Sequence, residues 1–376
     1  QVAGMFHVPL ARQSSERFSA DVPSPDDDWQ IGLIVGPSAS GKSTLARQAY
    51  APHLYRDGNW PRDRAVIDCF GDLSIRTITG LLTAVGFSSP PAWLRPFRVL
   101  SGGEQFRCQL ARALATSIAQ SKGTDPPLVV FDEFTSVVDR TVAKVCSAAI
   151  AKGIRQRKIP CRFVAVTCHY DVAEWLGADW VLDMASQRLD WRRLRRPPIQ
   201  LQIHRCRLEA WELFKRHHYL TGSLAPSARA FLTTWNDQPV AFCATLPVIT
   251  RKNHRRFTRI VTLPDYQGVG IGMHSVAAVA RLHRQEGHRM NVTSSHPALI
   301  RHCLRSPLWK TISVKKSGSS RCRHGDLTPS RSSLGRPVVS FEFVESPTLS
   351  SRGGPTAAQE RTHHEALIRR AKEQSI

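Results

Sequence analysis

The sequence lacks several features that would place it in a membrane or in an oxidising compartment. No run among its 376 residues approaches the roughly 18 apolar residues that a membrane-spanning helix needs, and no signal-peptide pattern opens the chain. Its nine cysteines include no Cys-x-x-Cys pair. An odd number of cysteines without such a pair favours a reducing compartment over a disulfide framework. We therefore expect a cytoplasmic location and no association with a membrane.

Acidic residues are also scarce. The chain has 30 Asp and Glu against 52 Lys and Arg, a formal net charge of +22. Residues 1–200 hold 25 basic and 19 acidic residues, whereas residues 201–376 hold 27 and 11. A surplus of this size is typical of proteins that bind a polyanion, so we expect nucleic acid as a partner. A solvated basic surface is the alternative.

The pattern of apolar segments predicts two folded units. Short buried strands over 31–35, 128–131 and 163–167, with helices over 104–118 and 141–152, indicate an α/β domain with a largely parallel sheet. We place this domain at residues 1–191, closed by a hairpin within 180–191, and a basic, proline-containing linker at 192–200.

Residues 201–344 are predicted to form an α+β domain. We expect a strand over 201–206, a helix over 209–217, and two strands around a tight turn at Asn236 and Asp237. A strand, a glycine loop and a helix follow within 259–287, then a strand over 289–295, a helix over 298–305 and a last strand over 336–344. A Ser/Arg/Gly-rich insertion is expected at 317–335 and a basic tail at 345–376.

A phosphate-binding loop is predicted between the first strand and the first helix. The residues from Gly36 to Ser43 fit the pattern G-x-x-x-x-G-K-[ST], whose backbone amides can surround phosphate oxygens at a helix N-terminus. Lys42 would reach the β and γ phosphates of ATP, and the Ser43 hydroxyl would ligate Mg²⁺. The expected nucleotide-binding residues are Gly36, Pro37, Ser38, Ala39, Ser40, Gly41, Lys42, Ser43 and Thr44.

Two carboxylates and a histidine follow later strands. Asp132 ends a strand that we expect beside the loop, so its carboxylate can hold Mg²⁺ together with Ser43. Glu133 is placed to deprotonate an attacking water, although an acidic pair at a strand end can also cap a helix. His169 lies just past the next strand and is expected to reach the γ phosphate.

A second phosphate-binding element is predicted at the start of a helix, in the stretch "LSGGEQ" from Leu100 to Gln105. Ser101, Gly102 and Gly103 offer a hydroxyl and exposed amides to an anion. One chain cannot easily close both elements on one nucleotide. Two copies would therefore pair head to tail, each supplying the half that the other needs.

Together these motifs resemble an ABC-type ATPase over about residues 1–191, in the order that this family uses. "LSGGEQ" is similar to the family's signature, "SVVD" ending at Asp139 to its interface segment, and His169 to its switch histidine. The resemblance implies that Ser101, Gly102, Gly103, Glu104 and Asp139 bind ATP across a homodimer. Gly71 stands where the family usually keeps a glutamine, and only 65 residues separate Gly36 from Ser101, so we expect a trimmed helical subdomain that is not part of a transporter.

A third phosphate-binding loop is predicted in the second domain. Gln267, Gly268, Val269, Gly270, Ile271 and Gly272 form a loop between an apolar strand and a helix. The following strand lacks the acidic residue of a dinucleotide-binding fold. The arrangement resembles the GNAT acyltransferase family over about residues 201–344. The resemblance implies that this loop binds the diphosphate of acetyl-CoA or another acyl-CoA. An ordinary strand-to-helix turn is the alternative.

The acid and base of such a reaction are not fixed by the sequence. His218, Tyr219 and His296 are candidates, each with a capping or buried role as the alternative. The basic run from Arg251 to Arg259 is expected to contact a nucleic-acid backbone. The His-Tyr element and the basicity resemble the Mom-type phage acyltransferases that modify DNA bases.

The sequence therefore predicts an ATPase fused to an acyl-CoA-dependent N-acyltransferase that acts on or with nucleic acid. Two alternatives remain open. One is a nucleic-acid-bound ATPase switch with a CoA-binding module that is not catalytic. The other is a protein or small-amine acetyltransferase.

Overall fold

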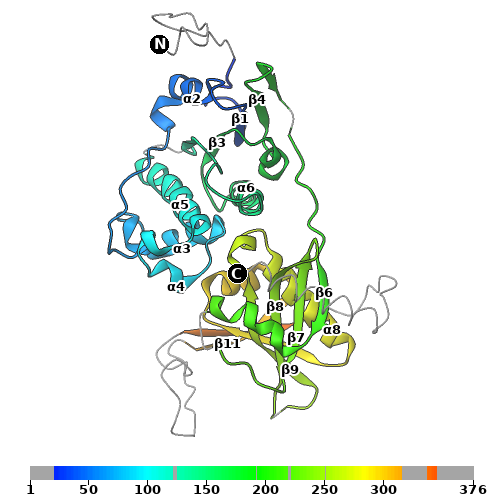
Figure 1. The fold of residues 1–376 in the computed structure, drawn as a ribbon. Coiled ribbons are helices and arrows are strands. Elements are labelled where there is room, and N and C mark those ends of the chain that lie inside the picture. The colour runs from blue at the N-terminus through cyan, green and yellow to red at the C-terminus, as the bar shows by residue number, and fades with distance from the viewer. Residues whose placement is uncertain are drawn as a thin grey trace, which may run out of the picture.

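The chain folds into two α/β units, each built around its own sheet (Figure 1). The computed structural model describes residues 21–121, 125–191, 193–218, 222–249, 251–315 and 337–344. Tyr219, Arg192, the expected insertion at 317–335 and the expected tail at 345–376 lie outside these residues. Within the described part of the chain, no helix is long and apolar enough to cross a membrane.

The N-terminal domain contains a five-stranded sheet and the helices that cover it. Its strands are β1 (Ile31–Val35), β2 (Leu128–Phe131), β3 (Arg162–Thr167), β4 (Trp180–Asp183) and β5 (Arg188–Asp190). Its α-helices are α2 (Lys42–Tyr50), α3 (Ile75–Ala84), α4 (Pro90–Trp93), α5 (Gly102–Gln120), α6 (Arg140–Arg155) and α7 (Ala173–Leu176). Its 3₁₀ helices are η1 (Ala51–His53), η2 (Val66–Cys69), η3 (Phe97–Val99) and η4 (Tyr170–Val172).

The strand order of this sheet is β2-β3-β1-β4-β5, and only β5 is antiparallel to its neighbour. The expected parallel sheet and terminal hairpin are therefore present. One detail differs from expectation, because β3 lies between β1 and the strand that ends at Asp132. The carboxyl ends of β1, β2 and β3 nevertheless meet at the same edge of the sheet, as in other parallel sheets.

The C-terminal domain contains a seven-stranded sheet in the order β11-β12-β10-β9-β8-β7-β6. Its strands are β6 (Gln202–Cys206), β7 (Arg229–Trp235), β8 (Gln238–Pro247), β9 (His254–Thr262), β10 (Arg289–Ser294), β11 (Trp309–Lys315) and β12 (Val338–Phe343). Its helices are the 3₁₀ turns η5 (Leu208–Leu213), η6 (Lys215–His217) and η7 (Pro264–Tyr266), and the α-helices α8 (Ile271–Gln285) and α9 (Pro297–Arg305).

Two expectations for this domain are wrong in detail. Residues 209–217 form 3₁₀ turns rather than one α-helix. Trp211 and Phe214 are both buried, and their spacing of three residues fits the three-residue turn of a 3₁₀ helix. Strand β11 was not expected, and only Trp309 among its residues is buried. The hairpin turn follows the expectation, since Asn236 and Asp237 both have positive φ angles of 49° and 61°.

Each domain has its own apolar core, and a further cluster joins the two. Val145 and Ala148 of α6 pack in one buried cluster with Val269 and Ile271, which flank the start of α8. The helix α6 lies at the boundary between the two domains (Figure 1). The loop expected to bind acyl-CoA is therefore part of the contact between the domains.

Two glycines allow the backbones to approach closely at this contact. Gly86 and Gly268 have backbone φ angles of 90° and 93°, and residues other than glycine rarely adopt this backbone conformation. A Cβ on Gly268 would lie 2.8 Å from the Gly86 Cα, and a Cβ on Gly86 would lie 2.7 Å from the Gln267 carbonyl oxygen. The contact leaves no room for a side chain on either residue.

The substitution Gly86→Ala should separate the domains. Gly71→Ala is a matched control, because Gly71 also has a positive φ, of 65°, yet an added Cβ would meet nothing within 4 Å. Both variants should lose about 1 kcal/mol of unfolding free energy from backbone strain. Gly86→Ala should lose about 1–3 kcal/mol more from the clash. Chemical denaturation and small-angle scattering measure both effects, and equal behaviour of the two variants would contradict this account of the interface.

Candidate functional site

The loop from Gly36 to Thr44 connects β1 to α2 and surrounds the Lys42 side chain. Ala39 and Gly41 have positive φ angles of 62° and 84°, which turn the backbone around the end of the loop. The Lys42 side chain is buried, and its ammonium donates a hydrogen bond to the Pro37 carbonyl. Its positive charge therefore lies inside the loop against a neutral oxygen.

The two residues expected to hold Mg²⁺ are in direct contact. The Ser43 hydroxyl donates a hydrogen bond of 3.0 Å to the Asp132 Oδ1, which also accepts from the Glu133 amide at 2.9 Å. Glu133 is exposed and has a positive φ of 52°. Backbone strain of this kind clusters at functional sites. The Glu133 carboxylate accepts a hydrogen bond of 2.7 Å from the Ser136 hydroxyl.

The residues of this loop fit a nucleotide phosphate and a divalent cation. Among the described residues, the buried Ser40 hydroxyl has no hydrogen-bond partner and the Lys42 ammonium contacts the Pro37 carbonyl without a carboxylate partner. An anion in the loop would satisfy both groups. The hydroxyl and carboxylate oxygens of Ser43 and Asp132 are the donor type that Mg²⁺ prefers.

The signature residues form the exposed start of α5. Ser101 caps the helix in a reciprocal capping box with Glu104, whose carboxylate accepts from the Ser101 amide at 3.0 Å. A Cβ on Gly102 would meet nothing within 4 Å. The backbone at this helix start is therefore open, as the expected phosphate contact requires.

The remaining residues of the expected ATP site lie at element ends. Asp139 caps α6 by accepting hydrogen bonds from the Thr141 and Val142 amides at 2.9 and 3.0 Å. His169 is half-buried just after β3, and its amide donates to the Thr167 hydroxyl. Gly71 follows η2 in the left-handed region.

A second candidate site is a cavity of about 1220 Å³ between the two domains. On the side of the C-terminal domain, the cavity opens where strands β9 and β10 diverge. These parallel strands pair only from His254 to Arg256 and from Arg289 to Asn291. Beyond this point the residues 257–262 and 292–294 line the cavity, with the loop from Gln267 to Gly272 at its edge.

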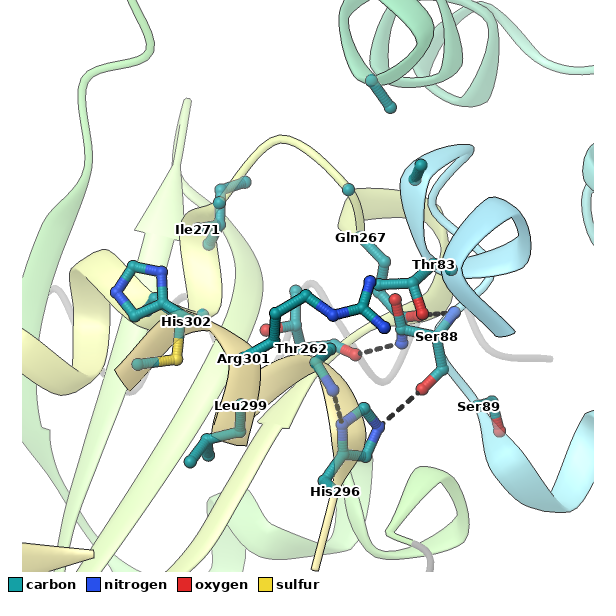
Figure 2. Close-up of a pocket in the computed structure, with 18 of the residues that line it drawn as sticks. Thr83, Ser88, Ser89, Thr262, Gln267, Ile271, His296, Leu299, Arg301 and His302 are labelled. Carbon is teal, nitrogen blue, oxygen red and sulfur yellow. Dashed lines mark hydrogen bonds between the residues drawn. The ribbon is translucent and has the colours of Figure 1, made fainter. Parts of the chain in front are cut away.

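The loop from Gln267 to Gly272 is held by the N-terminal domain. The Gln267 side chain accepts a hydrogen bond of 2.9 Å from the Ser88 amide and donates one of 3.0 Å to the Thr262 carbonyl (Figure 2). Gly270 has a φ of 104° and caps α8, while Val269 is buried between the domains. Gly268, Gly270, Ile271 and Gly272 face the cavity.

The three expected acid-base candidates differ in their surroundings. The His296 Nε2 donates to the Ser88 carbonyl at 2.9 Å, and its Nδ1 accepts from the Ala298 amide at 3.2 Å (Figure 2). His296 therefore joins the two domains through its Nε2 atom and caps α9 through its Nδ1 atom. His218 lines the same cavity and packs edge-on against Trp211, and Tyr219 lies outside the described residues.

The basic run expected to contact nucleic acid is only partly at the surface. Arg251, Lys252 and Arg256 are exposed. Arg255 is buried, and its guanidinium donates to the Thr245 carbonyl at 3.4 Å. Burial lowers the pKa of Arg255 and of Arg259. Three of the five basic side chains thus remain available to a partner.

The cavity has a strongly positive lining that sequence analysis missed. No Asp or Glu is among the described residues that line it. Its Arg, Lys and His residues come from both domains and are Arg76, Lys152, Arg157, Lys158, His217, His218, Arg259, His296, Arg301, His302 and Arg305. Sequence analysis had singled out only His218, His296 and Arg259 among them, for other roles. For the remaining positions the spacing of Arg301 and Arg305 on one helix face was the one signal in the sequence.

Buried histidines on this domain are held neutral. His283 is fully buried, its Nε2 bonds the Thr245 hydroxyl, and burial lowers its pKa to about 4 despite the nearby Glu286. Burial also lowers the pKa of His296, although the Ser88 carbonyl opposes this. The unfolded chain binds a proton on each of these histidines near pH 6.5, and folding moves this protonation to lower pH.

The free energy of unfolding should therefore fall as the pH is lowered from 7 to 5. His283 should contribute a slope of about 1 kcal/mol per pH unit, because the unfolded state gains the proton, and His296 should contribute in the same direction. Urea denaturation at several pH values measures it. The variant His283→Gln removes one titrating group and should reduce the slope by that amount. If His283→Gln leaves the slope of the unfolding free energy against pH unchanged, His283 is not held neutral in the native state.

Comparisons with known proteins agree with the predicted fold class. Residues 189–301 match the model of the acetyltransferase (GNAT) family. The match begins at residue 189, whereas we predicted that this domain starts at residue 201. A search of curated protein sequences found no significant match.

Solved structures similar to the chain divide into two groups. The IAA acetyltransferase from Bacillus cereus ATCC 14579 is 12% identical, with a TM-score of 0.30, and the match covers 38% of this chain and 99% of that one. The ribosomal-protein-S18-alanine N-acetyltransferase from Escherichia coli is 15% identical, with a TM-score of 0.29, over 40% of this chain and 100% of that one.

The second group consists of ATP-binding cassettes. CbiO1 from Clostridium perfringens, part of an ABC transporter complex, is 16% identical, with a TM-score of 0.34, over 43% of this chain and 75% of that one. The predicted fold class is confirmed, and the resemblance to Mom-type acyltransferases stays a prediction. Residues 189–301 are thus similar to GNAT acetyltransferases, and the N-terminal part of the chain is similar in structure to ABC ATPase cassettes.

Proposed function

We propose that the chain is an acyl-CoA-dependent N-acyltransferase whose N-terminal domain binds and hydrolyses ATP, and that its acceptor is nucleic acid. The observation that carries this proposal is the cavity between the two domains, which opens on the C-terminal domain where β9 and β10 diverge. It has a glycine loop at a helix start on one side and His218 on another. An extended ligand can enter such a gap between strands, because the strand edges leave backbone groups unpaired.

Each part of the cavity has a role in this reaction. The amides at the start of α8 hold the diphosphate of acyl-CoA, since Gly270 leaves them open. Acyl-CoA supplies a thioester-activated acyl group. His218 accepts the proton from the attacking amine, because its ring lines the cavity.

The N-terminal site supports ATP binding and hydrolysis. Lys42 neutralises phosphate charge, Ser43 and Asp132 hold Mg²⁺, and Glu133 orients and deprotonates water. The open start of α5 supports a head-to-tail homodimer, in which Ser101 of one copy completes the site of the other. This pairing, like the acceptor and the cytoplasmic location, is part of the proposal.

Nucleic acid is proposed as the acceptor because of the charge of the chain. The C-terminal part carries most of the +22 net charge, and Arg251, Lys252 and Arg256 are exposed on one strand and its preceding loop. Phosphate contacts of this kind release counterions, so binding should weaken steeply with salt.

The substitution Glu133→Gln should abolish ATP hydrolysis and keep ATP binding. Loss of a general base lowers turnover by about 100-fold or more, and bound ATP should then hold two copies together. The exposed Glu174 of α7 offers a control in the same domain, and Glu174→Gln should hydrolyse ATP normally. Phosphate release and gel filtration with ATP measure both effects. Normal turnover by Glu133→Gln would remove the proposed role.

Labelled acetyl-CoA should transfer its label to an amine of DNA or RNA. The variant His218→Ala should lower this transfer by about 100-fold, whereas His288→Ala, which lies outside the cavity, should not. The full chain is incubated with DNA, tRNA and protein acceptors at several salt concentrations, with label counted in each. Label found only in protein or in small amines would show that nucleic acid is not the acceptor. Acyl-CoA binding with no label in any acceptor would show a binding module instead of an enzyme.

A further inference from the structure

The charge of the cavity exceeds what a glycine loop needs. Seven Arg and Lys side chains line it without a single carboxylate among the described residues. Four of the seven, Arg76, Lys152, Arg157 and Lys158, belong to the N-terminal domain. Lys152, Arg259 and Arg301 are half-buried, whereas Arg76, Arg157, Lys158 and Arg305 are exposed. An anion among these side chains would offset their mutual repulsion. A ligand with several negative charges that reach both domains therefore fits this lining.

Lys152 is the cation nearest to the glycine loop. It lies near the end of α6, and its Nζ donates a hydrogen bond of 3.1 Å to the Val269 carbonyl. A Cβ on Gly270 would lie 3.0 Å from this Nζ. An anion at the start of α8 would thus meet the ammonium of Lys152 as well as the helix amides. Burial, followed by repulsion from Lys158, lowers the pKa of Lys152.

A second group of cations lies along α9. Arg301 extends from α9 toward Thr83 of the N-terminal domain (Figure 2), and its Nη1 would lie 3.5 Å from a Cβ on Gly80. Burial and repulsion from Arg305 and Arg76 lower the pKa of Arg301. The same causes, with Arg305 and Arg301 as the repelling groups, lower the pKa of Lys158. Within the described residues neither Lys158 nor Arg301 pairs with a carboxylate, although the Lys158 ammonium donates a hydrogen bond of 2.8 Å to the Gln156 side-chain oxygen.

We propose that the ATPase-like N-terminal domain supplies part of the acyl-CoA site. Lys152 binds the diphosphate, and Lys158 binds the 3′-phosphate together with Arg301 of the C-terminal domain. This inference rests on the proposed acyl-CoA-dependent function. Lys152 lies at the glycine loop and Arg301 near Gly80, and CoA carries its diphosphate and its 3′-phosphate as two distinct phosphate groups. A nucleic-acid backbone carries phosphates too, so the experiment below compares the two ligands.

Equilibrium binding of CoA and of 3′-dephospho-CoA to the full chain separates the two groups of cations. Loss of a charged phosphate contact weakens binding by about tenfold or more. Lys152→Met, which keeps the apolar stem of the side chain, should weaken both ligands by this factor. Lys158→Met should weaken CoA and leave dephospho-CoA unchanged, so that the preference of the wild type for CoA is lost.

Lys144→Met is the matched control on the same helix. Lys144 pairs with Asp171, with 3.7 Å between the Nζ and the Oδ2 atoms, and does not line the cavity. This variant should bind both ligands as the wild type does. Lys144→Met and Lys158→Met should keep the thermal unfolding midpoint of the wild type, and Lys152→Met, which loses its hydrogen bond to the Val269 carbonyl, should lower it only slightly. All three variants should keep the ATP affinity of the wild type, which separates a lost contact from a lost fold.

The outcomes distinguish this inference from the proposed function. A wild type that binds neither CoA nor acetyl-CoA overturns both. A wild type that binds CoA, with Lys152→Met and Lys158→Met unchanged, overturns only the contribution of the ATPase-like domain. A loss of DNA affinity in these variants with CoA affinity retained also overturns it and assigns the cations to the nucleic acid.

Discussion

The structure depends on the contact between the N-terminal domain and the segment from Pro264 to Ile271. Gly86 and Gly268 meet backbone to backbone, and Val145 and Ala148 bury Val269 beside them. This segment contains the loop that resembles a diphosphate-binding loop. Because it is fixed on one side by another domain, its amides have one conformation before any ligand arrives. A ligand then loses less binding free energy to ordering the loop.

Polar groups reinforce this contact and make it specific. Arg107 of α5 is fully buried and donates to the Asp265 carbonyl at 3.3 Å, while its Nη1 lies 3.9 Å from the Asp265 carboxylate. Burial raises the pKa of Asp265 although Arg107 opposes this shift. Gln267 and His296 bond the amide and the carbonyl of Ser88. A buried group that lost its partner here would carry the full cost of its desolvation, so other domain arrangements are disfavoured.

The sequence predicted local sites better than the contact between them. The loop from Gly36 to Ser43, the start of α5 and the loop before α8 each occupy contiguous residues, so their patterns could be recognised without the fold. Ser43 and Asp132 were paired correctly because parallel strands share one edge. Strand β11 was missed because only Trp309 of its residues is buried, so the strand lacks the alternation of a half-buried strand. Lys152 and Arg301 lie on helices far apart in the sequence, and only the packing of the two domains brings them to one cavity.

The geometry of two helices ties the candidate sites together. Helix α6 begins next to Asp139, which was expected at the nucleotide interface, and Lys152 lies in its last turn beside the loop of the C-terminal domain. Its 16 residues span about 24 Å. Helix α5 likewise begins at the signature residues and presents Arg107 to Asp265 one turn later. A hydrogen-bonded helix moves as a rigid body, so a change at either helix start must displace its contact with the acyl-CoA loop or be resisted by it. The two proposed sites, for nucleotide and for acyl-CoA, are thus connected by continuous packing, and not by the linker alone.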